Sequence, residues 1–189
     1  MSQNDIKKNM KLNFFRNIDA FFLKKLRHFQ HNKLTKILSM SGTFVFNFIL
    51  IVGIFFLPFT DARAIAATCL CAVIFDTLLL FILKYTVRRK RPVEPKGLRY
   101  RYDPYSFPSG HASRLAAMCA CCYSMPIVMS VLIVLCLACT FCRMVGKRHY
   151  FTDCLVGLII GILCGILVTW AVKNSILPVH YILYLFGLI

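Results

Sequence analysis

Long apolar runs divide a strongly basic chain and restrict it to a membrane fold. The 189 residues are 59% hydrophobic and yet carry a formal net charge of +16, a combination that soluble basic proteins seldom show. A membrane-spanning helix needs about 20 apolar residues. The chain has four such runs: Ile37–Phe59, Ala64–Leu83, Ala112–Cys142 with a break near Met125-Pro126, and Cys154–Val172. By their lengths, the third run predicts two spans and each of the others predicts one.

We therefore expect an all-α transmembrane bundle of about five to six spans. The tail Ile176–Ile189 would supply the sixth, tilted or partly interfacial. In Phe14–Phe29, apolar side chains recur near helical spacing among basic ones, which predicts an amphipathic helix on the membrane surface. The expected organisation is a basic amphipathic segment over residues 1–36 and one membrane-embedded domain over residues 37–189.

The cations predict the orientation of the bundle and its partners. Those of the N-terminal segment fall on the same face as the loops after the second and fourth spans, so the positive-inside rule places this face in the cytosol. Cations at the ends of spans favour anionic lipid headgroups over nucleic acid as the partner. The nine N-terminal cations are Lys7, Lys8, Lys11, Arg16, Lys24, Lys25, Arg27, Lys33 and Lys36.

Two kinds of polar side chain occur within the apolar runs. All ten cysteines lie in them or at their edges, which predicts packing as small hydrophobic residues and neither a disulfide framework nor a zinc site. Asp76 lies in the second run, eight residues before Lys84. We expect it to make a buried polar contact to another helix and not to react.

Three short blocks stand at the ends of these runs and carry the chemistry. They contain two histidines, a carboxylate, three cations and a glycine turn, which together suit the cleavage of a phosphate ester through a phosphorylated histidine. Each block alone is a weak signal, and their combination and order are specific. The blocks are Lys84-x6-Arg91-Pro92, Phe107-Pro108-Ser109-Gly110-His111 and Arg143-x5-His149-x3-Asp153.

Each block has a chemical and a structural interpretation. Lys84 and Arg91 would bind phosphate oxygens, or would only anchor a helix end at the interface. Gly110 would let the N–H groups of a helix start face an anion while His111 gives a proton to the leaving group. The alternative there is a Ser109 N-cap before a buried histidine.

In the third block, His149 and Asp153 are four residues apart and would meet if a helical turn begins there. The carboxylate would fix the tautomer of the imidazole and leave the other ring nitrogen free to attack phosphorus. The alternative is a solvated pair in a loop. An ionisable group at the start of a membrane span favours the functional interpretation.

Together the blocks resemble the signature of the type 2 phosphatidic acid phosphatase (PAP2) superfamily, whose core is shared with vanadium haloperoxidases. The resemblance covers roughly Ala64 to Val172. It implies that His149 is the nucleophile, Asp153 its orienting partner and His111 the acid for the leaving group, without a metal or other cofactor. The phosphate-binding residues that it implies are Lys84, Arg91, Ser109, Gly110 and Arg143.

One departure and one finer likeness qualify this resemblance. Cys142 stands before Arg143 where the family usually has serine. The run Tyr105–Arg114 and the short chain are most similar to the polyisoprenoid diphosphate phosphatases, a branch that includes presqualene diphosphate phosphatase and a relative thought to be inactive.

The expected function is hydrolysis of a lipid phosphate or diphosphate, with a polyisoprenoid diphosphate as substrate. A multi-pass protein of this kind would belong in the endoplasmic reticulum of a eukaryote, or in the inner or plasma membrane of a bacterium. Three alternatives stay open: a phosphatase for phosphatidic acid, another phospholipid or lipid A; a phosphatase for a soluble sugar phosphate; and a catalytically silent membrane scaffold. The lipid tail, the preference for mono- or diphosphate and the oligomeric state are not fixed by the sequence.

Overall fold

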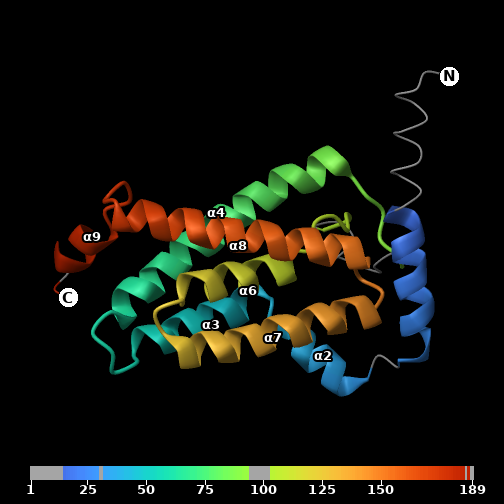
Figure 1. The fold of residues 1–189 in the computed structure, drawn as a ribbon, viewed down its shortest axis with the longest axis horizontal. Coiled ribbons are helices and arrows are strands. Elements are labelled where there is room, and N and C mark those ends of the chain that lie inside the picture. Colours follow the sequence, from blue (N-terminus) through green and yellow to red (C-terminus); the bar gives the residue numbers. More distant parts are fainter. Residues whose placement is uncertain (1–14, 30–31, 94–102, 186, 188–189) are drawn as a thin grey trace.

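The computed structural model describes residues 15–29, 32–93, 103–185 and 187, and their regular structure is entirely helical. The predicted all-α class is confirmed. Most helices run along the long axis of the molecule, and one lies across an end (Figure 1). After a helix over residues 15–25, the elements are η1 (Leu26–His28), α2 (Lys33–Met40), α3 (Phe44–Phe55), α4 (Ala62–Val87), α6 (Gly110–Cys121), α7 (Pro126–Val145), α8 (Phe151–Lys173) and α9 (Val179–Leu185).

Within the described residues, three helices are long and apolar enough to cross a membrane, namely α4, α7 and α8. The pair α2 and α3, bent by 61°, would form a fourth span. The sequence predicted five to six. The difference arises because α6 has 12 residues and α9 has seven, fewer than a span needs. The apolar helices make this an integral membrane protein, and the larger number of spans stays a prediction.

The breaks in the apolar runs have local causes. Pro126 is the first residue of α7, as the sequence predicted, because proline fits the first turn of a helix and has no N–H to lose there. The run Ile37–Phe59 is also broken, between α2 and α3, which the sequence did not predict. There a Cβ on Gly42 would lie 2.5 Å from the Cβ of His111. The bend therefore brings bare backbone against the start of α6.

Helix α6 is the interior element, surrounded by longer helices (Figure 1), and ten of its 12 residues are buried. Glycines spaced by four residues on α8 face its backbone. A Cβ on Gly161 would lie 2.0 Å from the Ser113 carbonyl oxygen. Small residues of this kind let two membrane helices approach closely. The other two are Gly157 and Gly165, where a Cβ would meet the carbonyl oxygens of Ser109 and Ala117 at 2.6 and 2.4 Å.

The polar side chain predicted within the second apolar run forms a hydrogen bond, and the cysteines are mostly buried as free thiols. Asp76 on α4 accepts a 2.5 Å hydrogen bond from the Ser113 hydroxyl on α6, so the predicted contact to another helix is confirmed. All ten cysteines are free thiols and eight of them are buried.

The predicted amphipathic segment forms the helix over residues 15–25, followed by η1. It lies across the end of the bundle where α8 begins (Figure 1). Its inner face contains the partly buried Ile18 and Phe22 and the buried Asp19, while Phe21 is exposed. Residues 1–14 lie outside the described residues. The inward acidic side chain was not predicted.

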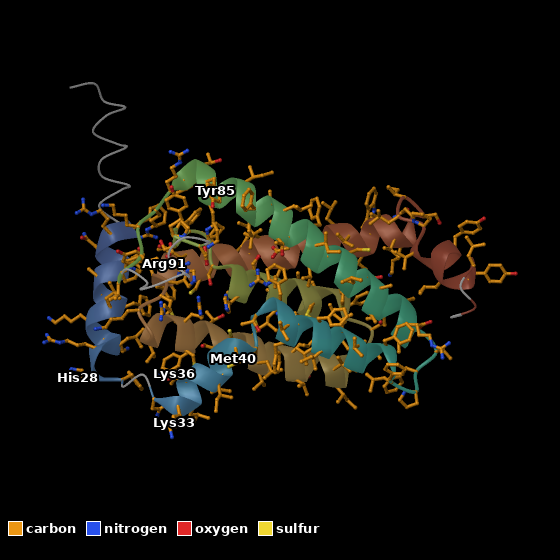
Figure 2. The ribbon with its side chains drawn as sticks, turned by 180° about the vertical axis from the view of Figure 1, so that it is seen from behind. His28, Lys33, Lys36, Met40, Tyr85 and Arg91 are labelled. Atoms are coloured by element: carbon orange, nitrogen blue, oxygen red, sulfur yellow. The ribbon has the colours of Figure 1, made fainter. Side chains whose placement is uncertain are left out.

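The ends of α4 and α7 and the starts of α6 and α8 meet at this same end of the molecule (Figure 1). Arg91 lies there, as do Lys33 and Lys36 of α2 (Figure 2). Lys7, Lys8 and Lys11 fall outside the described residues, and the cytosolic orientation of this end stays a prediction. The six described N-terminal cations are all exposed: Arg16, Lys24, Lys25, Arg27, Lys33 and Lys36.

Replacing Gly161 by alanine should destabilise the bundle, because the new Cβ would overlap the backbone of α6. Overpacking of a helix interface costs about 1–3 kcal/mol, so we expect the Tm in detergent to fall by several degrees. Gly53→Ala is the matched control, since nothing lies within 4 Å of a Cβ there. Equal Tm values for the two variants would contradict the close packing of α6 on α8.

Candidate active site

The three sequence blocks converge at one end of the bundle. Lys84 lies in the last turn of α4 and Arg143 in the last turn of α7. His111 is the second residue of α6, and His149 lies just before α8. A cavity of about 340 Å³ opens between the starts of α3 and α6, the last turns of α4, the loop before α6 and His149. Its polar and charged lining includes Lys84, Asp103, His111, Arg114 and His149.

His149 is held with one ring nitrogen toward a carbonyl and the other toward cations. Nδ1 lies 2.7 Å from the Ser106 carbonyl oxygen. A carbonyl only accepts hydrogen bonds, so Nδ1 carries the proton and Nε2 keeps its lone pair. Nε2 lies 3.4 Å from an Arg91 nitrogen and 3.3 Å from an Arg143 nitrogen. The unprotonated nitrogen therefore faces two groups that can bind anions.

The surroundings of His149 keep its ring neutral. Burial, with 1% of the side chain exposed, lowers the pKa of His149 well below the ordinary 6.5, and the charges of Arg143, Arg91 and Lys84 lower it further. Both causes disfavour the protonated form. Near neutral pH the imidazole consequently has an unprotonated nitrogen available for attack.

Lys84 and Arg91 share one carboxylate, that of Asp103. The Lys84 ammonium donates to Oδ1 and the Arg91 guanidinium to Oδ2, each at 2.7 Å. Burial alone would raise the pKa of Asp103, but the charges of Lys84 and Arg91 outweigh it and lower the pKa below its ordinary value. The carboxylate is thus ionised near neutral pH. Two cations placed around an anion in this way can equally bind phosphate oxygens.

The second block connects α6 to α8. The Ser109 N–H donates to the Asp153 carbonyl at 3.0 Å. Ser109 occupies the N-cap position of α6, as its structural interpretation predicted, but its side chain makes no capping hydrogen bond. Gly110 begins the helix, and a Cβ there would lie 3.0 Å from an Arg114 nitrogen. His111 is 9% exposed and lines the same cavity as His149.

Asp153 lies near His149 but is not its hydrogen-bond partner. Nδ1 and Oδ2 are 4.0 Å apart, beyond hydrogen-bonding distance. Asp153 instead accepts from the Tyr150 N–H at 2.9 Å, because it is the third residue of α8 and completes a capping box there. Its other oxygen binds Arg89 at 2.6 Å. The Ser106 carbonyl takes the place on Nδ1 that the sequence predicted for this carboxylate.

Sequence reasoning missed several contributors to the site. Ser106 acts through its backbone, which no side-chain pattern can reveal. Arg89 belongs to a basic cluster that could be interpreted as an interface anchor. Arg114 is 7% exposed, donates to the Gly42 carbonyl at 2.9 Å and lines the cavity. Its only signal was its place in the run that resembles the diphosphate phosphatases. Cys142, the departure from the family pattern, is buried beside Arg143.

Metal ligands do not cluster among the described residues of the site. No group of three or more His, Cys, Asp or Glu side chains in the described parts of the chain could hold such an ion. The positive charge around His149 Nε2 comes from arginine and lysine side chains. Independence from metals stays a prediction.

The sequence matches a known protein family over more than half of its length. Residues 64–177 match the PAP2 superfamily. The chain belongs to this superfamily. The matched segment contains all three blocks and agrees with the extent predicted from the sequence.

Two solved structures are similar to this chain in fold. A transmembrane PAP2-type phosphatidylglycerolphosphate phosphatase from Bacillus subtilis is similar with a TM-score of 0.68 and 23% identity, over 86% of this chain and 88% of that one. The LpxE protein of Aquifex aeolicus is similar with a TM-score of 0.59 and 20% identity, over 83% of this chain and 93% of that one. At these identities the likeness concerns the fold.

Asp103→Asn should strengthen the binding of inorganic vanadate or phosphate. The carboxylate competes with an added anion for Lys84 and Arg91, and the amide would release both cations. We expect binding to tighten about tenfold, which corresponds to about 1.4 kcal/mol, by titration calorimetry in detergent at pH 7. Unchanged or weaker binding would show that an anion does not use these two cations.

Proposed function

We propose that the protein is a membrane-bound hydrolase that removes phosphate from a lipid phosphate or diphosphate through a phosphohistidine intermediate. The observation that carries the proposal is the environment of His149. Its unprotonated Nε2 lies between Arg91 and Arg143, beside a cavity that it shares with a second histidine, His111. A nucleophile, positive charge for the phosphoryl oxygens and a proton donor are the components that such a reaction needs.

The steps follow from the tautomer of His149. Nε2 attacks phosphorus while the bond from phosphorus to the leaving oxygen breaks, and His111 gives that oxygen a proton. Lys84, Arg91 and Arg143 stabilise the charge on the phosphoryl oxygens in the transition state. The Ser106 carbonyl, which accepts from Nδ1, supports the positive charge that forms on the imidazole. Water, deprotonated by His111, then cleaves the phosphorus–nitrogen bond and releases inorganic phosphate.

The cavity wall favours a lipid over a soluble substrate. Its apolar side is formed by Phe44, Leu80, Phe81 and Tyr85. Phe44 and Phe81 are 52% and 59% exposed on helices with apolar outer surfaces, so the wall reaches the side of the bundle that faces the bilayer. A phosphate could bind at the cations while an attached chain stays in the lipid. A sugar phosphate would leave these apolar residues unused.

A polyisoprenoid diphosphate is the substrate that we propose. The likeness of Tyr105–Arg114 to that branch supports it, and so does the additional cation that Arg114 contributes to the cavity, since a diphosphate carries more negative charge than a monophosphate. Phosphatidic acid and other lipid phosphates are the main alternatives. The similar fold of a phosphatidylglycerolphosphate phosphatase keeps a glycerophospholipid phosphate among them.

Hydrolysis by purified wild-type protein and His149→Ala tests the proposal. Farnesyl diphosphate, phosphatidic acid and glucose 6-phosphate would be compared in detergent with excess chelator, with phosphate release as the readout. We expect fastest turnover of farnesyl diphosphate and a loss of at least about a thousandfold in the variant, because no other group replaces the nucleophile. His28→Ala, an exposed histidine of η1, is the control and should keep full activity.

Each other outcome of this experiment has a definite meaning. Turnover by His149→Ala near the wild-type rate would remove His149 from the mechanism. A preference for glucose 6-phosphate would refute the lipid assignment, and no turnover of any substrate would favour the silent scaffold. Activity that requires an added divalent ion would contradict the proposed role of the three cations.

The pH dependence of kcat/KM should report the depressed pKa of His149. An imidazole with a lowered pKa stays unprotonated as the pH falls through 6.5 and is protonated only at lower pH. The acid limb of the profile, where kcat/KM falls as this group is protonated, therefore lies below 6.5. Arg143→Gln removes one of the charges that lower the pKa and should move the limb to higher pH while reducing the rate.

Comparing the variants on one substrate removes the effect of substrate ionisation. Lys147→Gln, an exposed cation two residues before His149, is the control and should leave the limb in place. A limb that stays fixed or moves to lower pH in Arg143→Gln would show that another group controls it.

A further inference from the structure

The helix over residues 15–25 has a single acidic residue, Asp19, and this side chain points into the protein. Only 2% of it is exposed, whereas the basic residues Arg16, Lys24 and Lys25 of the same helix are exposed. A carboxylate is seldom buried unless cations or N–H groups compensate its charge. The partners of Asp19 therefore indicate its role.

Those partners lie at the start of α8 and in the loop after α4. Oδ1 of Asp19 accepts from the Thr152 N–H at 3.0 Å, and Oδ2 accepts from the Thr152 hydroxyl at 2.8 Å. Oδ2 also accepts from Arg89 at 2.5 Å. Residues separated by 133 positions in the sequence are thus joined at the N-terminus of the helix that follows His149.

Arg89 extends this network to the catalytic end of the bundle. Its second terminal nitrogen donates to Asp153 at 2.6 Å and to the Thr152 hydroxyl at 2.8 Å. Its guanidinium lies 4.0 Å from the centre of the Tyr150 ring. Asp153 is fully buried and 4.0 Å from His149 Nδ1. One guanidinium therefore bridges two buried carboxylates, the nearer of which borders the imidazole.

An aromatic contact holds the N-terminal helix in the same place. The rings of Phe22 and Phe151 are stacked, with centroids 3.9 Å apart and planes within 8° of parallel. Phe22 is one helical turn after Asp19, and Phe151 is the residue before Thr152. The two contacts fix the helix on the start of α8, where Figure 1 shows it crossing the end of the bundle.

We propose that Asp19 is a positioning residue for phosphoryl transfer, which the N-terminal helix supplies to the active site by holding Arg89 on Asp153 and fixing the first turn of α8. This inference rests on the proposed function, because its effect passes through His149. Asp19 touches neither the phosphate nor the imidazole in this arrangement. Its contribution is to keep Arg89 paired with Asp153 and the segment from His149 to Asp153 in one conformation.

The physical reason is that Arg89 is partly exposed, with 26% of its side chain accessible. Without the Asp19 carboxylate, the guanidinium loses one of its two anionic partners, and turning toward water becomes easier. Asp153 would then be a buried carboxylate without its Arg89 partner. A small shift toward another donor, such as His149 Nδ1, would restore a hydrogen bond. That shift competes with the Ser106 hydrogen bond and misaligns Nε2. Misplacement by an ångström costs about a hundredfold in rate.

Asp19→Asn is the test because it preserves volume and one oxygen for the Thr152 N–H while removing the charge on Arg89. With the whole 189-residue chain in detergent, we expect kcat for farnesyl diphosphate to fall about tenfold to a hundredfold and KM to change by less than about twofold. Vanadate affinity should stay within about twofold, since Lys84, Arg91 and Arg143 are untouched. Asp61→Asn, an exposed residue before α4 at the other end of the bundle, is the matched control.

A double-mutant cycle with Arg89→Gln separates positioning from simple stabilisation. If Asp19 acts through Arg89, Asp19→Asn should add little to the loss in kcat caused by Arg89→Gln, because coupled residues are not additive. Additive losses would overturn the proposal. So would a variant whose Tm falls while the kcat of the folded protein equals that of Asp61→Asn.

Phe22→Ala provides an independent route to the same result. It removes the stacking on Phe151 without altering any charge, and we expect the same pattern of lowered kcat with unchanged KM, to a smaller extent. Unchanged kcat in both Phe22→Ala and Asp19→Asn would refute a role for the helix. Failure of the proposed function is distinguishable, because wild type and Asp61→Asn would then also be inactive.

Discussion

Burial of positive charge at one end of an apolar bundle is the constraint on which the site depends. Burying a cation is costly unless an anion or hydrogen bonds compensate for it. Lys84 and Arg91 share Asp103, and Arg89 is shared by Asp19 and Asp153. Asp19, Asp103 and Asp153 are thus three of only seven acidic residues in the chain, and all three lie where the cations gather.

The same charges determine the protonation state of His149. Arg143 and Arg91 both face Nε2 of His149, so a second proton on this buried ring would add a third positive charge in one place. The ring stays neutral, and its lone pair points where an anion would bind. An imidazole with an unprotonated nitrogen and cations able to bind an anion therefore arise from one electrostatic arrangement. The carboxylate of Asp103 balances part of this charge until an anion competes with it.

Close helix packing holds this arrangement in place. The glycines of α8 let it approach the backbone of α6, which brings the first turn of α6 beside the first turn of α8 and joins Ser109 to Asp153. The bend between α2 and α3 puts Gly42 against His111 from another side. The N-terminal helix closes the same end through Asp19. His111 and His149 thus belong to different helix starts that are fixed by contacts along the whole of α6.

The sequence by itself determined the helical membrane class, the break at Pro126 and the choice of candidate site residues, because hydrophobic length and side-chain chemistry are local properties. These residues are His111, His149, Lys84, Arg91 and Arg143. Tertiary structure alone decided which groups touch. The Ser106 carbonyl accepts a hydrogen bond from His149, and Asp153 accepts from the Tyr150 N–H and from Arg89. Asp19 accepts from the Thr152 N–H in α8, 133 residues away. These contacts depend on helix crossings and loop paths, which are set by packing over the whole bundle and leave no periodic or spaced signal in the chain.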